Sequence, residues 1–144
     1  MATVRDLLAR KHGEVISISP TDTALHAAQT MNQHGIGGLV VLEGGTLLGV
    51  FTERDILRRV VAAGRDPAST PVREVMTSPV ITCLPDTSIE ECGAIMSKRR
   101  IRHLPVTDDR GLVGLVTSGD LLAFQVAEQT ATIQYLNSYM FDVR

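Results

Sequence analysis

The sequence has no tryptophan and only five aromatic residues among its 144, so its core is expected to be aliphatic. Its two cysteines, Cys83 and Cys92, are too few for a disulfide framework or a metal-binding framework. Free cysteines usually lie buried as small apolar side chains. We therefore expect two reduced, buried thiols in a cytoplasmic protein.

Long apolar runs are also missing: none approaches the roughly 20 residues that span a bilayer. Residues 1–10 carry scattered charges and lack the apolar stretch of a signal peptide. The net charge of −2 gives no sign of the basic surface that binds nucleic acid or an anionic membrane. We therefore expect no nucleic-acid partner and no membrane contact.

The motifs of catalysis are absent as well. His12, His26, His34 and His103 do not stand at metal-ligand spacings with either cysteine. The sequence contains no nucleophile elbow, no phosphate-binding P-loop and no dinucleotide-binding glycine motif. The expectation is therefore a protein that is not an enzyme, with no catalytic residue, no metal site and no required cofactor.

What the sequence does contain is an internal repeat. A shift of 65 positions aligns residues 15–61 with residues 80–126 without a gap, placing Asp55 on Asp120. The segments that precede the two copies, residues 4–8 and 72–76, also resemble each other, at a shift of 68. The first copy thus carries three extra residues around positions 11–13.

Each copy predicts the order β-α-β-β-α. An apolar strand (residues 15–19 or 80–84) precedes a helix that Thr23 or Ser88 caps and that ends near His34 or Arg99. A hairpin follows, with Gly44-Gly45 at the turn of the first copy. The last helix covers residues 54–63 or 119 to about 127.

The fold class is therefore α+β, with repeat 1 and its lead-in over residues 4–62, a linker over 63–71 and repeat 2 over 72–127. A unit of about 50 residues buries too little surface to be stable alone. We expect the two repeats to pack their sheets face to face around one shared core, as one pseudo-twofold module.

The end of each hairpin, where the last helix of the repeat begins, carries the same motif. Residues 48–55 (LGVFTERD) and 113–120 (VGLVTSGD) both read apolar-Gly-apolar-apolar-Thr-x-x-Asp. The pattern resembles the CBS (cystathionine β-synthase) domain, which occurs in pairs as a Bateman module, and the resemblance covers about residues 4–127. The chain's small size resembles the stand-alone bacterial CBS pairs assigned to signal transduction.

The resemblance implies a regulatory adenine nucleotide (AMP, ADP, ATP or NAD) bound between the repeats, a disc-shaped homodimer, and an effector protein that the sequence does not identify. Asp55 and Asp120 stand where a carboxylate can accept hydrogen bonds from ribose hydroxyls, beside a helix N-terminus that favours phosphate. Thr52 and Thr117 can cap the helix or contact ribose or phosphate. Thr-x-x-Asp is also an ordinary helix start, and the two roles are compatible.

Basic residues near the motifs are candidates for the phosphate. The resemblance implies this role for Arg102 and His103, and Arg54 is close enough in sequence to share it. Solvated helix and loop faces are the alternative for these side chains. The first copy has Gly37 and Gly38 in place of Arg102 and His103, so we expect the Asp55 cleft to be the poorer nucleotide site of the two.

The first strands are expected to line the adenine through backbone groups and small apolar side chains. Whether those side chains face the cleft or the core is open. The residues are Ser17, Ile18, Pro20, Thr82, Cys83, Pro85 and Pro105.

A different reading is a protein-interaction or dimerisation module with no physiological nucleotide. Residues 128–144 form a helical tail that holds three of the five aromatics, Tyr135, Tyr139 and Phe141, beside an apolar stripe. The tail can pack on its own repeats, on the partner subunit of a homodimer, or on another protein. We expect the homodimer.

Overall fold

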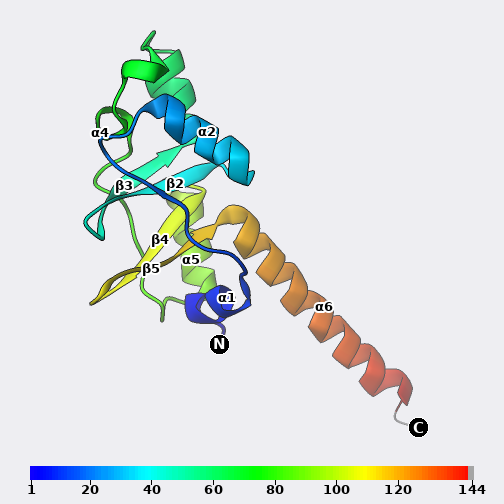
Figure 1. The fold of residues 1–144 in the computed structure, drawn as a ribbon. Helices are drawn as coiled ribbons and strands as arrows, with labels where there is room; N and C mark the ends of the chain where they lie inside the picture. Colours follow the sequence, from blue (N-terminus) through cyan, green and yellow to red (C-terminus); the bar gives the residue numbers. More distant parts are fainter. Residues whose placement is uncertain (143–144) are drawn as a thin grey trace.

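The computed structural model describes the backbone of residues 1–142 and the side chains of residues 1–140. Two similar units follow one another, and a long C-terminal helix projects from the second (Figure 1). In chain order the elements are α1 (Val4–Arg10), β1 (Ser17–Ile18), α2 (Ala24–His34), β2 (Gly38–Glu43), β3 (Thr46–Thr52), α3 (Glu53–Asp55), the π-helical η1 (Ile56–Val61), the 3₁₀ turn η2 (Pro67–Ser69), α4 (Val72–Val75), α5 (Ile89–Arg99), β4 (His103–Asp108), β5 (Gly111–Thr117) and α6 (Ser118–Asp142).

The repeat is confirmed in the sheets. In the first unit β1 runs parallel to β2, which pairs antiparallel with β3. In the second unit β4 pairs antiparallel with β5. Each hairpin has a register shift, between Val41 and Leu42 in one and between Val106 and Thr107 in the other. These positions are 65 residues apart. Gly44 and Gly45 both have positive φ, as the predicted turn requires.

The predicted first strands are too long. Only Ser17–Ile18 is a strand in repeat 1, and in repeat 2 a single parallel bridge joins Cys83 to Val106. In repeat 2 the cause is Pro105. In repeat 1 the Val40 N–H donates to the Ile16 carbonyl at 3.3 Å. Pro105 stands at the equivalent position and has no N–H to donate.

The second helix of repeat 1 is also not the regular α-helix that was expected over residues 54–63. After one α-helical turn, η1 continues with the wider hydrogen bonding of a π-helix, in which the Ala62 N–H donates to the Leu57 carbonyl at 2.9 Å. This geometry keeps Val60 fully buried, while Leu57 and Val61 face outward.

The lead-in helices are exchanged between the repeats. Val4 and Leu7 of α1 pack in the core of repeat 2, beside Cys92 and Leu104. Val72 and Val75 of α4 pack in the core of repeat 1. The Val4 N–H donates to the Thr87 carbonyl at 2.8 Å, and the Val72 N–H donates to the Asp22 carbonyl at 2.8 Å. Each repeat therefore completes the other.

This exchange explains the glycine of the repeated motif. A Cβ on Gly114 would lie 2.8 Å from Leu8 Cδ1 in the lead-in of repeat 1. A Cβ on Gly49 would lie 2.5 Å from the Thr77 carbonyl oxygen, just after the lead-in of repeat 2. Both glycines let a lead-in cross closely over the strand.

The expected single shared core is instead three clusters. Each repeat has its own core, on one face of its strands, with Leu39 and Val41 inward in the first. Val40, between them, faces the opposite side of the sheet and joins Val50 and Leu115 in a smaller cluster between the two sheets. This alternation is the period of a strand. The sheets do meet face to face, but through this minor cluster.

The predicted helical tail is continuous with the last helix of repeat 2, since α6 runs unbroken over 25 residues. Leu121 and Phe124 at its base are buried. From Gln125 to Met140 every side chain is exposed, so the alternative that the tail packs on its own repeats is wrong for these residues. The side chain of Phe141 lies outside those that the structure describes. Across residues 1–142, none of the helices has the length and apolar content that crossing a membrane requires.

Candidate functional site

The two Thr-x-x-Asp motifs form matching helix caps. The Asp120 N–H donates to Thr117 Oγ1 at 3.0 Å, and the Thr117 N–H donates to Asp120 Oδ2 at 2.9 Å. Thr52 and Asp55 repeat this reciprocal pair, at 3.3 and 3.0 Å. The expected capping role is thus present in both repeats. It uses one carboxylate oxygen of each aspartate.

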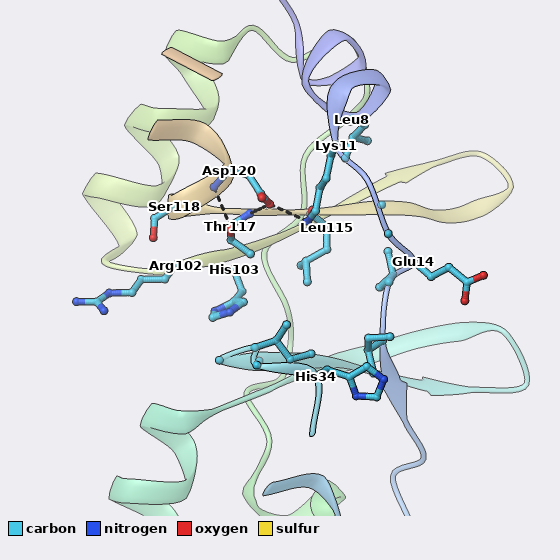
Figure 2. Close-up of a pocket in the computed structure, with 18 of the residues that line it drawn as sticks. Leu8, Lys11, Glu14, His34, Arg102, His103, Leu115, Thr117, Ser118 and Asp120 are labelled. Carbon is cyan, nitrogen blue, oxygen red and sulfur yellow. Dashed lines mark hydrogen bonds and ion pairs between the residues drawn. The ribbon is translucent and has the colours of Figure 1, made fainter. Parts of the chain in front are cut away.

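The two motif aspartates line different cavities. Asp120 lies in the larger of these two, which has a volume of about 690 Å³ (Figure 2). Its walls come from both repeats: the segment after α1, the end of α2 and its loop, and the end of β5 with the start of α6. The apolar part of the lining includes Val15, Ile16, Ile36, Val113 and Leu115.

Lys11 reaches into this cavity from the lead-in of repeat 1. Its Nζ donates to Asp120 Oδ2 at 2.7 Å and to the Leu115 carbonyl at 2.7 Å. Burial by itself raises the pKa of Asp120, but the hydrogen bonds from Lys11 and from Thr117 outweigh it and hold that pKa below its ordinary value. The carboxylate is therefore ionised at neutral pH.

Sequence reasoning missed Lys11. The signal that could have found it is the insertion of three residues at positions 11–13, which has no counterpart in the second copy. Because these three residues have no equivalent in repeat 2, the ion pair with Lys11 exists in one cleft and not in the other.

Asp55 is much less accessible, with 5% of its surface exposed. Its Oδ1 accepts a hydrogen bond from Thr77 Oγ1 at 3.0 Å and lies 3.7 Å from Arg59 Nε. Its Oδ2 accepts from both the N–H and the hydroxyl of Thr52. Both carboxylate oxygens of Asp55 are thus engaged within the protein. The cavity beside it has a volume of about 220 Å³.

Repeat 1 has no equivalent of Arg102 and His103, but the Asp55 cleft still contains cations. Arg54, Arg100 and Arg102 all line it, and Arg54 Nη1 donates to the Arg100 carbonyl at 3.1 Å. Arg102 and His103 stand at the start of β4, and both residues line both cavities. The sequence assigned these two residues to one repeat, whereas the pseudo-twofold arrangement shares them between the clefts.

The His103 ring accounts for the glycine at the equivalent position of the first copy, Gly38. A Cβ on Gly38 would lie 2.8 Å from His103 Nε2, so the ring occupies the space that Gly38 leaves open. Burial lowers the pKa of His103; Lys11 and Arg102 lower it further, and Glu53 and Asp120 only partly oppose this. The ring is therefore neutral at pH 7 and offers one donor and one acceptor, not the positive charge that we expected.

The comparison with known proteins fits this architecture. The family model for the CBS domain matches the chain twice, over residues 3–62 and 72–127. The chain belongs to the CBS-domain family. It is 39% identical over 131 residues to the CBS domain-containing protein YhcV of Bacillus subtilis, covering 91% of each chain.

Other CBS relatives show where such modules are used. A CBS-domain structure from Burkholderia ambifaria, provisionally assigned to signal transduction, superimposes with a TM-score of 0.85 at 37% identity, covering 89% of this chain and 96% of that one. An inosine-5'-monophosphate dehydrogenase from Korarchaeum cryptofilum is 37% identical over 109 residues, which are 75% of this chain and 22% of the enzyme. CBS pairs are thus regulatory modules that stand alone or form a minor part of an enzyme.

The residues expected to line an adenine do not line either of the two cavities. Ile18 and Cys83 point into the two cores, which answers the question that the sequence left open. None of the seven lines either cavity; Pro20 and Pro105 are buried, Ser17 and Thr82 are exposed and Pro85 is half-buried. Their neighbours Val15 and Ile16 line the Asp120 cavity instead.

The two cysteines lie together in the core of repeat 2, both free. A hydrogen bond to Cys92 and burial raise the pKa of Cys83, so this thiol is protonated and unreactive. Among the residues that the structure describes, no cluster of three or more His, Cys, Asp or Glu side chains could hold a metal ion.

Proposed function

We propose that this CBS pair binds an adenine nucleotide in the Asp120 cleft and acts as a non-catalytic sensor in signal transduction or energy sensing. AMP, ADP, ATP and NAD share the adenosine that the cleft would recognise. The supporting observation is an ionised, partly exposed carboxylate at a helix N-terminus inside a cavity of about 690 Å³. Small-molecule sites typically measure about 300–1,000 Å³.

The cleft offers a partner for each part of an adenosine nucleotide. Asp120 can accept hydrogen bonds from the ribose hydroxyls, which are donors. Val15, Ile16 and Leu115 supply an apolar wall for the base. Arg102 at the edge of the same cavity can pair with phosphate oxygens through its forked guanidinium.

The Asp55 cleft offers a weaker site. It has the arginines that a phosphate needs, but its carboxylate already accepts hydrogen bonds on both oxygens and its cavity is smaller. A ribose there would have to displace Thr77 or Arg59. We therefore propose one principal nucleotide per chain, in the Asp120 cleft.

The proposed setting is the cytoplasm, where the two free, buried thiols would stay reduced. The proposal involves no chemical conversion of the nucleotide. An effector protein, not identified by the chain, would respond to the bound state.

A second candidate is an interaction module whose clefts stay empty. The observation in its favour is that Asp120, like Asp55, is already paired inside the protein, through Lys11. Such a module needs no ligand to satisfy its polar groups.

Thermal unfolding with and without nucleotide separates the two functions. A ligand at 100 times its dissociation constant stabilises the folded state by about 2.7 kcal/mol. We expect AMP, ADP, ATP or NAD to raise the melting temperature, and GMP or CMP to raise it less. Unchanged melting with all four adenine nucleotides at millimolar concentration would favour the interaction module. Mass spectrometry of co-purified small molecules would identify the ligand, and unchanged nucleotide after long incubation would exclude turnover.

A further inference from the structure

The C-terminal helix α6 leaves the body of the protein and continues alone (Figure 1). At 1.5 Å per residue its 25 residues extend about 37 Å. Its base is anchored: Arg10 pairs with Glu128 at 2.6 Å and stacks over Phe124 at 4.7 Å. Beyond Glu128 the helix makes no contact with the repeats that would bury a described side chain.

The exposed part of α6 carries a heptad seam. Apolar residues and one glutamine follow one another at spacings of four, three, four, three and four residues. The five apolar members are each 49% to 68% exposed. The seam consists of Leu122, Val126, Gln129, Ile133, Leu136 and Met140. A sustained repeat of this period is the pattern of a left-handed coiled coil, in which the seam faces another helix.

An unpaired α6 would be poorly stable. Residues 129–140 contain no charged side chain, so no ion pairs between successive turns support the helix. Thr130, Thr132 and Ile133 are β-branched, which lowers helix propensity. Isolated helices of about 12–15 residues are marginal in water even when their composition is favourable. The seam therefore needs a partner.

The flanks of the seam point to an identical partner. In heterotypic coiled coils, charges beside the seam select a different chain. Here the flanking positions are all uncharged: Ala123, Gln125, Thr130, Thr132, Asn137 and Tyr139. Two copies of α6 can approach without like-charge repulsion.

Gln129 indicates the orientation. In a parallel, in-register pair it faces the same glutamine of the second copy, so the two amides can bond to each other. In an antiparallel pair that overlaps the same seam, it would face Ile133, and a buried amide would lose its partner. We infer that two copies of this chain associate through a parallel coiled coil of their α6 helices.

The test uses the full chain in light scattering, because the dimer does not depend on the proposed nucleotide. We expect twice the mass of 15.6 kDa without ligand. Ile133→Asp should give a monomer, while Ala131→Asp, on the outer face two residues away, should stay dimeric. A wild-type monomer at about 100 µM would overturn the inference and leave the seam to another protein. A dimeric Ile133→Asp would also overturn it, because the dimer would then lie elsewhere.

Disulfide trapping tests the register and covers the case in which both aspartate variants are monomeric. Under mild oxidation Gln129→Cys should form a covalent dimer, and Ala131→Cys should not. Trapping at neither position, or equally at both, would overturn the parallel seam. Wild-type protein in the same oxidant controls for Cys83 and Cys92, which are buried.

Discussion

Lys11 and Asp120 belong to different repeats and form an ion pair of 2.7 Å inside the larger cleft. The pair occupies an oxygen that a bound ribose would also use, so lysine and ligand compete. Lys11→Met should therefore raise the affinity for adenosine, which carries no phosphate, by about fivefold, the equivalent of about 1 kcal/mol. Calorimetry measures this. The same variant should raise the pKa of Asp120, because it removes the hydrogen bond that lowers it. A loss of adenosine affinity would show that Lys11 contacts the ligand instead.

Asp120→Asn keeps the size of the side chain and much of its helix cap but removes its charge. We expect nucleotide affinity to fall tenfold or more, because a hydrogen bond to a charged group is worth about 1.5–3 kcal/mol. Asp55→Asn is the matched control, and it should mainly lower stability, since both Asp55 oxygens are engaged within the protein. Equal affinity for wild type and Asp120→Asn in calorimetry would leave the motif with its capping role alone.

Arg102→Ala should weaken AMP about tenfold, since a charged hydrogen bond to phosphate is lost. Adenosine should bind as before. Arg100→Ala is a useful comparison, because Arg100 lines the smaller cavity but not the larger one. If Arg102→Ala weakens AMP and adenosine equally, the side chain supports the fold and does not contact phosphate.

His103 should make stability depend on pH in a defined direction. Its pKa in the folded protein lies below the ordinary 6.5, chiefly because the ring is buried. As the pH falls through 6.5, the unfolded chain takes up a proton that the folded protein does not, so folding free energy is lost until the folded pKa is reached. Urea unfolding at a series of pH values between 7.5 and 5 should show this loss of folding free energy. His103→Gln should flatten the curve, whereas the exposed His34→Gln should not.

Gly38 and His103 should be coupled in a double-mutant cycle. Gly38→Ala places a methyl group 2.8 Å from the imidazole, and such overpacking costs about 1–3 kcal/mol. In a His103→Gly background the same alanine should cost much less, because the space is vacant. Additive effects in chemical denaturation would mean that the ring moves aside freely.

The sequence predicted the parts of the fold that local pattern controls. The ends of α2 and α5 at His34 and Arg99 follow from their caps and their apolar spacing. The missing strand of repeat 2 was also readable, since Pro105 cannot donate to it. Which repeat each lead-in packs on was not, because a duplicated sequence gives both copies the same apolar surface.

Only part of the candidate site was predicted, because local pattern controls only part of it. Thr52, Asp55, Thr117 and Asp120 were found because the motif repeats them. Lys11 was missed because its role depends on the exchange of lead-ins, which brings it within 2.7 Å of a residue 109 positions later in the chain. The sharing of Arg102 between two clefts likewise depends on how the repeats meet, and no local pattern encodes that.

The exchanged lead-ins also have a consequence for synthesis on the ribosome. Repeat 1 can close its core once Val72 and Val75 have emerged from the ribosome. α1 leaves the exit tunnel before repeat 1, yet it packs against Cys92, Leu104 and Phe124 of repeat 2, which are made after repeat 1. Val4 and Leu7 must therefore remain exposed to chaperones and proteases until repeat 2 has been made. A ribosome that stalls within repeat 2 therefore leaves α1 unprotected, even though the core of repeat 1 can already have closed.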